Sequence, residues 1–220
     1  MAAKIFLDWN KIDTVFLDMD GTLLDLHYDN HFWLEYLPTQ YAKKHQISLD
    51  NAKDQLKARY GSFKGTLNWY CIDHWSKQLD MDMLALKQET SQRIKVRENV
   101  EHFLQFLQQQ QKRIILLTNA HPKTIAIKFQ HTSIEPYFDK IITSHDIGLA
   151  KEQTGFWEKL QQQFDFNKER SLFIDDNLNV LRTAKRYNIG YLLAIHQPDS
   201  QQKSINTEEF TAIECFTQLS

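Results

Sequence analysis

The stretch "TVFLDMDGTLLDL", residues 14–26, joins a short apolar run to two closely spaced carboxylates. The run "VFL" is continuous rather than alternating, which is typical of a strand buried on both faces of a parallel sheet. Asp18 and Asp20 follow it, and Gly21 comes next. Residues two apart can leave a strand on the same side, and Gly21 permits a tight turn there. The stretch therefore predicts a buried strand that ends in an acidic site.

Four more runs of this kind follow along the chain, and helical patterns separate them. Over residues 98–110, for example, apolar side chains recur at helical spacing on one face. Alternating strands and helices build right-handed crossovers, so the sequence predicts an α/β fold with a doubly wound parallel sheet. The segment "FTAIECFTQL" (210–219) could form a terminal strand and helix that pack on this core. The five runs are "VFLD" (15–18), "RIILLTN" (113–119), "KIITS" (140–144), "SLFIDD" (171–176) and "YLLAIH" (191–196).

The first and second runs are much further apart than one crossover requires. Residues 27–96 are extra, and their pattern is helical, which predicts a helical insertion after the first strand. The core would then comprise residues 1–26 and 97–220. Within the insertion one buried helix face is predicted at the positions Leu67, Tyr70, Cys71, His74 and Trp75.

Composition narrows the classes of partner. Lys+Arg is 26 and Asp+Glu is 28, which gives a net charge of −2 and argues against a nucleic-acid polymer or a membrane surface. No apolar stretch approaches the length of a membrane span, and the start of the sequence lacks the pattern of a secretory peptide. Cys71 and Cys215 are far apart, without metal-ligand spacing. We therefore expect a reduced, cytoplasmic protein.

Polar side chains stand where three of the predicted strands end. In an open α/β sheet, ligands bind beyond the carboxyl ends of the strands. Carboxylates gathered there repel one another unless a cation binds, and an all-oxygen site suits Mg²⁺. Mg²⁺ held this way commonly also contacts a substrate phosphate. The expected metal ligands are Asp18, Asp20, Asp175 and Asp176, and the expected phosphate-binding residues are Thr118, Asn119 and Lys151.

Two carboxylates at one strand end can divide the chemistry between them. Asp18 can attack phosphorus to form an aspartyl-phosphate. Asp20 can protonate the leaving alcohol and then activate water. Each residue alone has an ordinary structural explanation, since a paired aspartate often caps a helix and a lysine is usually solvated. Their joint order at the strand ends favours the functional interpretation.

Four motifs in order resemble those of haloacid dehalogenase-like hydrolases. "FLDMDGTLLD", "LLTNA", Lys151 and "FIDDN" match the four motifs of that superfamily. The resemblance implies a Rossmann-like sheet of strand order 5-4-1-2-3, with the insertion acting as a cap. It implies Asp18 as nucleophile and Asp20 as general acid/base, with Asp20 also lending its backbone carbonyl to Mg²⁺. It further implies Asp176 as the principal acidic Mg²⁺ ligand, assisted by Asp175.

The third motif departs from the superfamily pattern. The superfamily often has proline after its lysine, whereas Glu152 follows Lys151 here. Lys140 and Lys159 are less well-placed candidates for the lysine of the third motif.

Asp20 indicates the reaction class, because dehalogenase members of the superfamily lack this second aspartate. Its presence favours phosphoryl transfer.

Three segments also resemble bacterial purine 5'-nucleotidases: "DMDGTLLDLHYDNHFW", "TLNWYCIDHW" and "LLTNAHP". That resemblance implies hydrolysis of purine nucleoside monophosphates such as GMP and IMP. The alternatives are a sugar-phosphate phosphatase or phosphomutase of the same superfamily, and a non-catalytic protein that binds a phosphate ligand. The sequence leaves the oligomeric state open.

Cap aromatic side chains could stack on a purine base. Aromatic residues at helical spacing are usually core, so residues off the predicted buried face are the better candidates. Asn68, Trp69 and Asp73 meet this criterion and are predicted to face the substrate. His27, Asp29 and Asn30 could line the same mouth.

Overall fold

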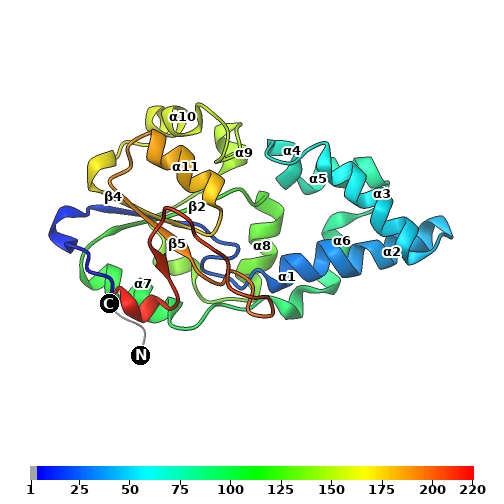
Figure 1. The fold of residues 1–220 in the computed structure, drawn as a ribbon, viewed down its shortest axis with the longest axis horizontal. Helices are drawn as coiled ribbons and strands as arrows, with labels where there is room; N and C mark the ends of the chain where they lie inside the picture. Colours follow the sequence, from blue (N-terminus) through cyan, green and yellow to red (C-terminus); the bar gives the residue numbers. More distant parts are fainter. Residues whose placement is uncertain (1–3) are drawn as a thin grey trace.

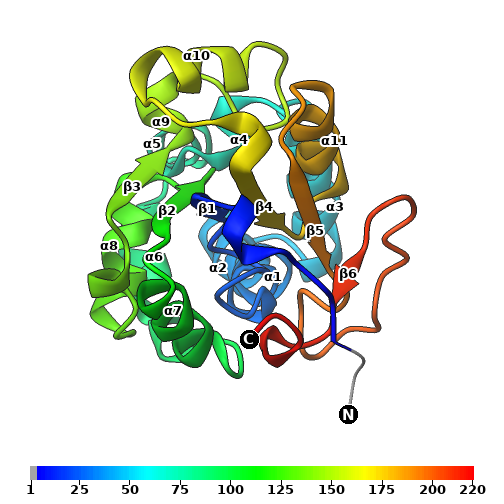
Figure 2. The same ribbon diagram turned by 90° about the vertical axis from the view of Figure 1, so that its left-hand side faces the viewer.

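The computed structural model describes residues 4–220, and its centre is a six-stranded parallel sheet. The strand order is β3-β2-β1-β4-β5-β6 (Figure 2). In the middle of the sheet, Leu17 pairs with Leu116 on one side and with Ile174 on the other. The strands are β1 (Thr14–Leu17), β2 (Arg113–Thr118), β3 (Lys140–Thr143), β4 (Ser171–Asp175), β5 (Tyr191–Ile195) and β6 (Ala212–Ile213).

The α/β class and the order of the first five strands are confirmed. The order 5-4-1-2-3 is incomplete, because β6 adds a sixth strand beside β5. This strand has only two residues, so it is too short to produce a recognisable apolar run. The terminal strand is followed by a 3₁₀ turn, η6 (Phe216–Gln218), that packs on the core.

Helices cover both faces of the sheet (Figure 2). One face packs against α7 (Val100–Gln109) and α8 (Pro122–Gln130), and the other against α10 (Phe156–Gln163) and α11 (Leu178–Arg186). The short helix α9 (Ser144–Ile147) follows β3 directly. The remaining 3₁₀ turns of the core are η1 (Trp9–Lys11), η4 (Glu135–Tyr137) and η5 (Lys168–Arg170).

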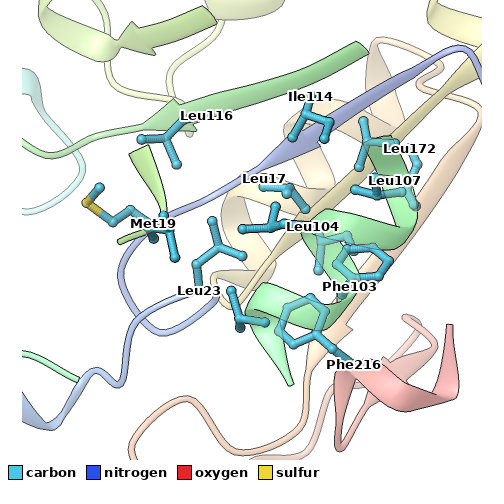
Figure 3. Packing of buried hydrophobic residues seen from close by; sticks show 14 of the residues in the cluster. Leu17, Met19, Leu23, Phe103, Leu104, Leu107, Ile114, Leu116, Leu172 and Phe216 are labelled. Atoms are coloured by element: carbon cyan, nitrogen blue, oxygen red, sulfur yellow. The ribbon is translucent and has the colours of Figure 1, made fainter. Parts of the chain in front are cut away.

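Local chemistry sets where these helices begin. Asn177 caps α11, and its side-chain oxygen accepts a hydrogen bond from the Asn179 amide at 3.0 Å. Pro122 opens α8, where its missing amide proton is not needed. On α7 the side chains of Phe103, Leu104 and Leu107 are buried against β1 and β2 (Figure 3). The predicted face of this helix is therefore the face that packs on the sheet.

Residues 27–93 form a group of helices at one end of the molecule (Figure 1). They have an apolar core of their own, which includes Phe32, Leu56, Trp75 and Met83. The elements are α1 (His27–His31), the π-helix η2 (Phe32–Tyr36), α2 (Leu37–His45), α3 (Leu49–Gly61), α4 (Leu67–Tyr70), α5 (Ile72–Leu79), α6 (Met83–Glu89) and the 3₁₀ turn η3 (Ser91–Arg93). We call this group the cap.

One predicted cap helix is interrupted. The chain is extended at Cys71, with φ −89° and ψ 107°, so α4 ends there and α5 begins. The break rotates the helical register. The fully buried residues of α5 are Ile72, Trp75 and Leu79, so the predicted continuous face from residue 67 to residue 75 is wrong. Cys71 instead caps α5, because its sulfur accepts a hydrogen bond from the His74 amide at 3.4 Å.

Among residues 4–220, no helix combines the length and the apolar character that crossing a membrane requires.

Replacing Leu104 by alanine should lower the free energy of unfolding by about 2–5 kcal/mol, because the change leaves a cavity in a fully buried layer. Urea denaturation followed by circular dichroism measures this loss. Gln108→Ala changes an exposed position of the same helix and should shift stability by less than about 0.5 kcal/mol. Equal losses in the two variants would contradict this packing.

Candidate active site

Lys151 joins the ends of β1 and β4. Its ammonium donates hydrogen bonds to Asp18 Oδ1 at 2.5 Å and to Asp175 Oδ2 at 2.6 Å. All three side chains are buried. A third hydrogen bond goes to the Leu117 carbonyl at 3.0 Å, so all three ammonium protons of Lys151 have partners. The rival lysines lie elsewhere: Lys159 is exposed, and the ammonium of Lys140 lies over the Phe164 ring.

Three carboxylates converge beside this lysine. One oxygen from each of Asp18, Asp175 and Asp176 can be chosen so that all lie within 4.8 Å of one another. Burial raises the pKa of Asp18 to about 6, against the opposing charge of Lys151. Burial and the neighbouring carboxylates raise the pKa of Asp176 well above its usual value. One lysine therefore does not neutralise this group, and an oxygen-only donor set with excess negative charge fits a hard cation such as Mg²⁺.

Gly21 brings the acidic turn close to β4. Its φ is +81°, and a Cβ built on it would lie 2.5 Å from Asp176 Oδ2. The amide of Gly21 donates to the Leu24 carbonyl at 2.8 Å, which closes the turn after Asp20. Glycine is therefore needed at this position both for the backbone conformation and for the approach of Asp176.

The end of β2 supplies Thr118 and Asn119, and both side chains are buried. The hydroxyl of Thr118 accepts a hydrogen bond from the Ala120 amide at 3.0 Å and keeps its proton for another acceptor. The amide side chain of Asn119 accepts from the Lys151 backbone at 2.9 Å and donates to Glu152 at 2.9 Å. This side chain therefore fixes the loop that carries Lys151.

A chain of buried charges leads from Asp20 into the cap. Lys128 of α8 donates to Asp20 at 2.6 Å and to Asp29 at 2.8 Å. Asp29 of α1 also accepts from Lys87 of α6 at 2.7 Å. Burial raises the pKa of Asp20 to about 6, and the charge of Lys128 limits that rise.

Sequence reasoning missed both lysines. They occupy apolar helix faces, where Lys128 follows Thr124 and Lys87 follows Met83 at the i+4 spacing of a buried stripe. Their i+4 spacing from these buried residues is a sequence signal, but it becomes informative only once the helix face is known to be buried.

A cavity of about 330 Å³ opens between the cap and the carboxyl edge of the sheet. Its polar end holds the strand-end residues Asp18, Asp20, Thr118, Lys151, Asp175 and Asp176. Its cap wall is largely aromatic, with Trp33, Tyr60, Trp69, Tyr70 and Trp75. Among the cap residues predicted to face a substrate, Trp69 lines this cavity, as do Asp29 and Asn30.

The other three predicted cap residues lie elsewhere. His27 is not part of the cavity wall, and its Nδ1 lies 3.5 Å from Asp199 Oδ1. Asn68 is exposed and is not part of the cavity wall. The carboxylate of Asp73 pairs with Lys123 of α8 at 2.7 Å, outside the cavity.

The fold and the site define an α/β enzyme with an acidic, lysine-bridged centre beneath a helical cap. Comparisons with known proteins agree. The family model for haloacid dehalogenase-like hydrolases matches residues 12–188. The GMP/IMP nucleotidase YrfG of Escherichia coli (strain K12) is 39% identical over 196 residues, which cover 89% of this chain and 88% of that protein, and the same values hold for YrfG of Shigella flexneri.

The chain belongs to the haloacid dehalogenase-like hydrolases. Solved structures share its fold. A HAD phosphatase from Thermococcus onnurineus has a TM-score of 0.75 at 19% identity, covering 94% of this chain and 95% of that one. The HAD hydrolase YfnB from Bacillus subtilis has a TM-score of 0.61 at 18% identity, covering 94% and 96%.

Replacing Gly21 by alanine should weaken Mg²⁺ binding by at least about tenfold, because the added Cβ displaces Asp176. Isothermal titration calorimetry with MgCl₂ measures the change. Gly65→Ala is the matched control, since Gly65 has a φ of +78° but open space around the added Cβ. The explanation fails if both variants bind Mg²⁺ as the unaltered protein does.

Proposed function

We propose that this protein is a Mg²⁺-dependent phosphomonoesterase that removes the 5'-phosphate from purine nucleoside monophosphates, GMP and IMP among them. The observation that carries the proposal is the two-ended cavity: buried carboxylates and Lys151 at one end, and an aromatic cap wall at the other. The 39% identity to GMP/IMP nucleotidases over most of the chain supports the same substrate class.

Asp18 is proposed as the nucleophile. Lys151 and the Met19 amide hold its carboxylate at the end of β1, so one oxygen can attack the phosphorus. A P–O bond forms to Asp18 as the ester P–O bond breaks. The leaving oxygen of the nucleoside takes the proton of Asp20, which lies two residues further on. Lys151 and Thr118 would hold the phosphoryl oxygens by charge and by the free hydroxyl proton.

The second half of the reaction uses Asp20 in reverse. Its carboxylate removes a proton from a water molecule, and the resulting oxygen attacks phosphorus. The Asp18–phosphorus bond breaks, inorganic phosphate leaves, and Asp20 is again protonated. The hydrogen bond from Lys128 holds the Asp20 carboxylate in the same orientation during both steps of the reaction.

Mg²⁺ would be held by Asp18, Asp175 and Asp176, with the backbone carbonyl of Asp20. When bound, the ion neutralises phosphate charge as the transition state forms. The convergence of three carboxylates supports this assignment.

The aromatic wall is proposed as the purine end. Trp33, Tyr60 and Trp75 pack edge to face, with ring centroids 5.3–5.9 Å apart. Such packing leaves rigid aromatic surface toward the cavity, and stacking of a base on an aromatic ring contributes about 1–3 kcal/mol. The expected substrate is therefore a small phosphate ester.

We expect the enzyme to work in the cytoplasm, where Cys71 and Cys215, both free thiols, stay reduced.

A phosphate-release assay tests the proposal. Nucleoside monophosphates and sugar phosphates are compared with Mg²⁺ and with EDTA. We expect Mg²⁺-dependent release, fastest from GMP and IMP, and none from the Asp18→Asn variant. Preference for sugar phosphates would show that the proposed nucleotide substrate class is wrong. Activity that survives EDTA or the Asp18→Asn substitution would overturn the mechanism. Transfer to a second sugar position with little free phosphate would indicate a mutase.

Replacing Lys128 by methionine should lower kcat by about 10²-fold, the lower end of what general acid–base catalysis contributes. The lost positive charge also raises the pKa of Asp20. Because Asp20 must carry a proton for the first half, the alkaline limb of kcat/KM should move to higher pH.

Steady-state kinetics over a pH series measure both effects of Lys128→Met. Lys159→Met, at an exposed position of α10, is the control and should behave as the unaltered enzyme. An unshifted alkaline limb would contradict the role given to Lys128.

A further inference from the structure

Three metal-ligating side chains meet beside the active-site cavity. They are Cys71 between α4 and α5, His121 at the start of α8 and His145 on α9. One ligand atom from each can be chosen so that all lie within 4.8 Å of one another. Cys71 belongs to the cap, whereas both histidines belong to the core. The cluster therefore spans the boundary between these two parts of the molecule.

His145 has no partner for either ring nitrogen among the described residues. Both nitrogens are buried, and neither has a hydrogen bond. Its ring packs edge-on against His121, with centroids 4.7 Å apart. A buried polar group without a partner is rare and unfavourable, which points to a ligand that this structure does not contain.

Asp73 lies next to this cluster and offers a fourth donor. Its Oδ2 is 3.6 Å from His121 Nε2. The carboxylate is now held by Lys123, an exposed lysine that can release one oxygen at little cost. The four donors are then one sulfur, two imidazole nitrogens and one oxygen, divided equally between cap and core.

We propose that Cys71, His121 and His145, with Asp73 as fourth ligand, bind a single Zn²⁺-type ion that ties the cap to the core. Thiolate and imidazole donors favour Zn²⁺ over Mg²⁺. This site is therefore distinct in chemistry from the all-carboxylate cluster at the strand ends.

The geometry requires only a modest contraction. Bonds of about 2.0–2.3 Å to a tetrahedral ion place ligand atoms about 3.5 Å apart. The donor atoms of Cys71, His121 and His145, which lie within 4.8 Å of one another, must therefore approach by about an ångström. Cys71 releases its proton to solvent when it binds. His121 binds through Nε2 and moves its proton to Nδ1, which gives up the long 3.3 Å hydrogen bond from the Lys123 amide.

Cobalt spectroscopy tests the site without any substrate. Co²⁺ is titrated into the full-length protein with Mg²⁺ in excess, so that Mg²⁺ occupies the carboxylate cluster. We expect one equivalent to bind with a thiolate-to-cobalt charge-transfer band in the near ultraviolet. Zn²⁺ should then abolish that band by displacement.

Two variants and two controls identify the ligands. Cys71→Ser keeps an oxygen to cap α5 and should lose the band. His145→Gln should shift the titration midpoint by more than about tenfold. The controls are Cys215→Ser, at the other thiol, and His131→Gln, at an exposed histidine. Both controls should retain the charge-transfer band and the titration midpoint of the unaltered protein. A missing band in the unaltered protein, or a band that survives Cys71→Ser or needs Cys215, would overturn the proposal.

A bound ion would restrain the cap, and this consequence rests on the proposed nucleotidase function. Zn²⁺ added at saturating Mg²⁺ should slow phosphate release by the unaltered enzyme more than by Cys71→Ser. Equal inhibition would overturn the restraint. The cobalt titration needs no turnover, so failure of the metal site and failure of the nucleotidase proposal are distinguishable.

Discussion

The buried ammonium of Lys151 holds the active centre together. It lies between Asp18 and Asp175, at the ends of two adjacent strands, and all three side chains are buried. Burying such charges is costly, and removing one member of a buried pair typically destabilises a protein by about 3–5 kcal/mol. The lysine itself is fixed by its backbone bond to Asn119. The position of the proposed nucleophile therefore depends on three strand ends meeting at one cation, which the parallel register of β1, β2 and β4 provides.

The cap is connected to this centre by polar contacts rather than by a continuous apolar core. Its own hydrophobic cluster is separate from the two clusters that flank the sheet. Contacts between the two parts include the series from Lys87 through Asp29 and Lys128 to Asp20, the hydrogen bond from Tyr70 to Glu152 at 2.7 Å, and the pair of Asp73 with Lys123. Charged and hydrogen-bonded contacts can exchange with water more readily than packed side chains, which suits a cap that admits substrate and releases product. Because one of these contacts reaches Asp20, the position of the cap and the geometry of the proposed general acid are linked.

Much of this arrangement was predictable because it is local in the sequence. Continuous apolar runs identified five strands, and polar residues directly after them identified the strand ends that meet at the cavity. What the sequence did not reveal depends on tertiary packing. Lys87 and Lys128 look like solvated lysines until their helix faces are known to be buried. The break at Cys71 follows from how α4 and α5 pack, since the apolar spacing itself runs on without interruption. The approach of Cys71 to His145 has no sequence signature, because the two residues come from different halves of the fold.

The central claim is that Asp18 carries the phosphoryl group during turnover. Sodium borohydride reduces an acyl phosphate to an alcohol, so rapid quenching of the working enzyme into borohydride converts a phosphorylated aspartate to homoserine. Mass spectrometry of the peptides then locates the change. With GMP and Mg²⁺ present, we predict homoserine at position 18 alone, and none when either is omitted. Conversion at another carboxylate, or an unchanged Asp18 in an enzyme that is turning over, would contradict the mechanism.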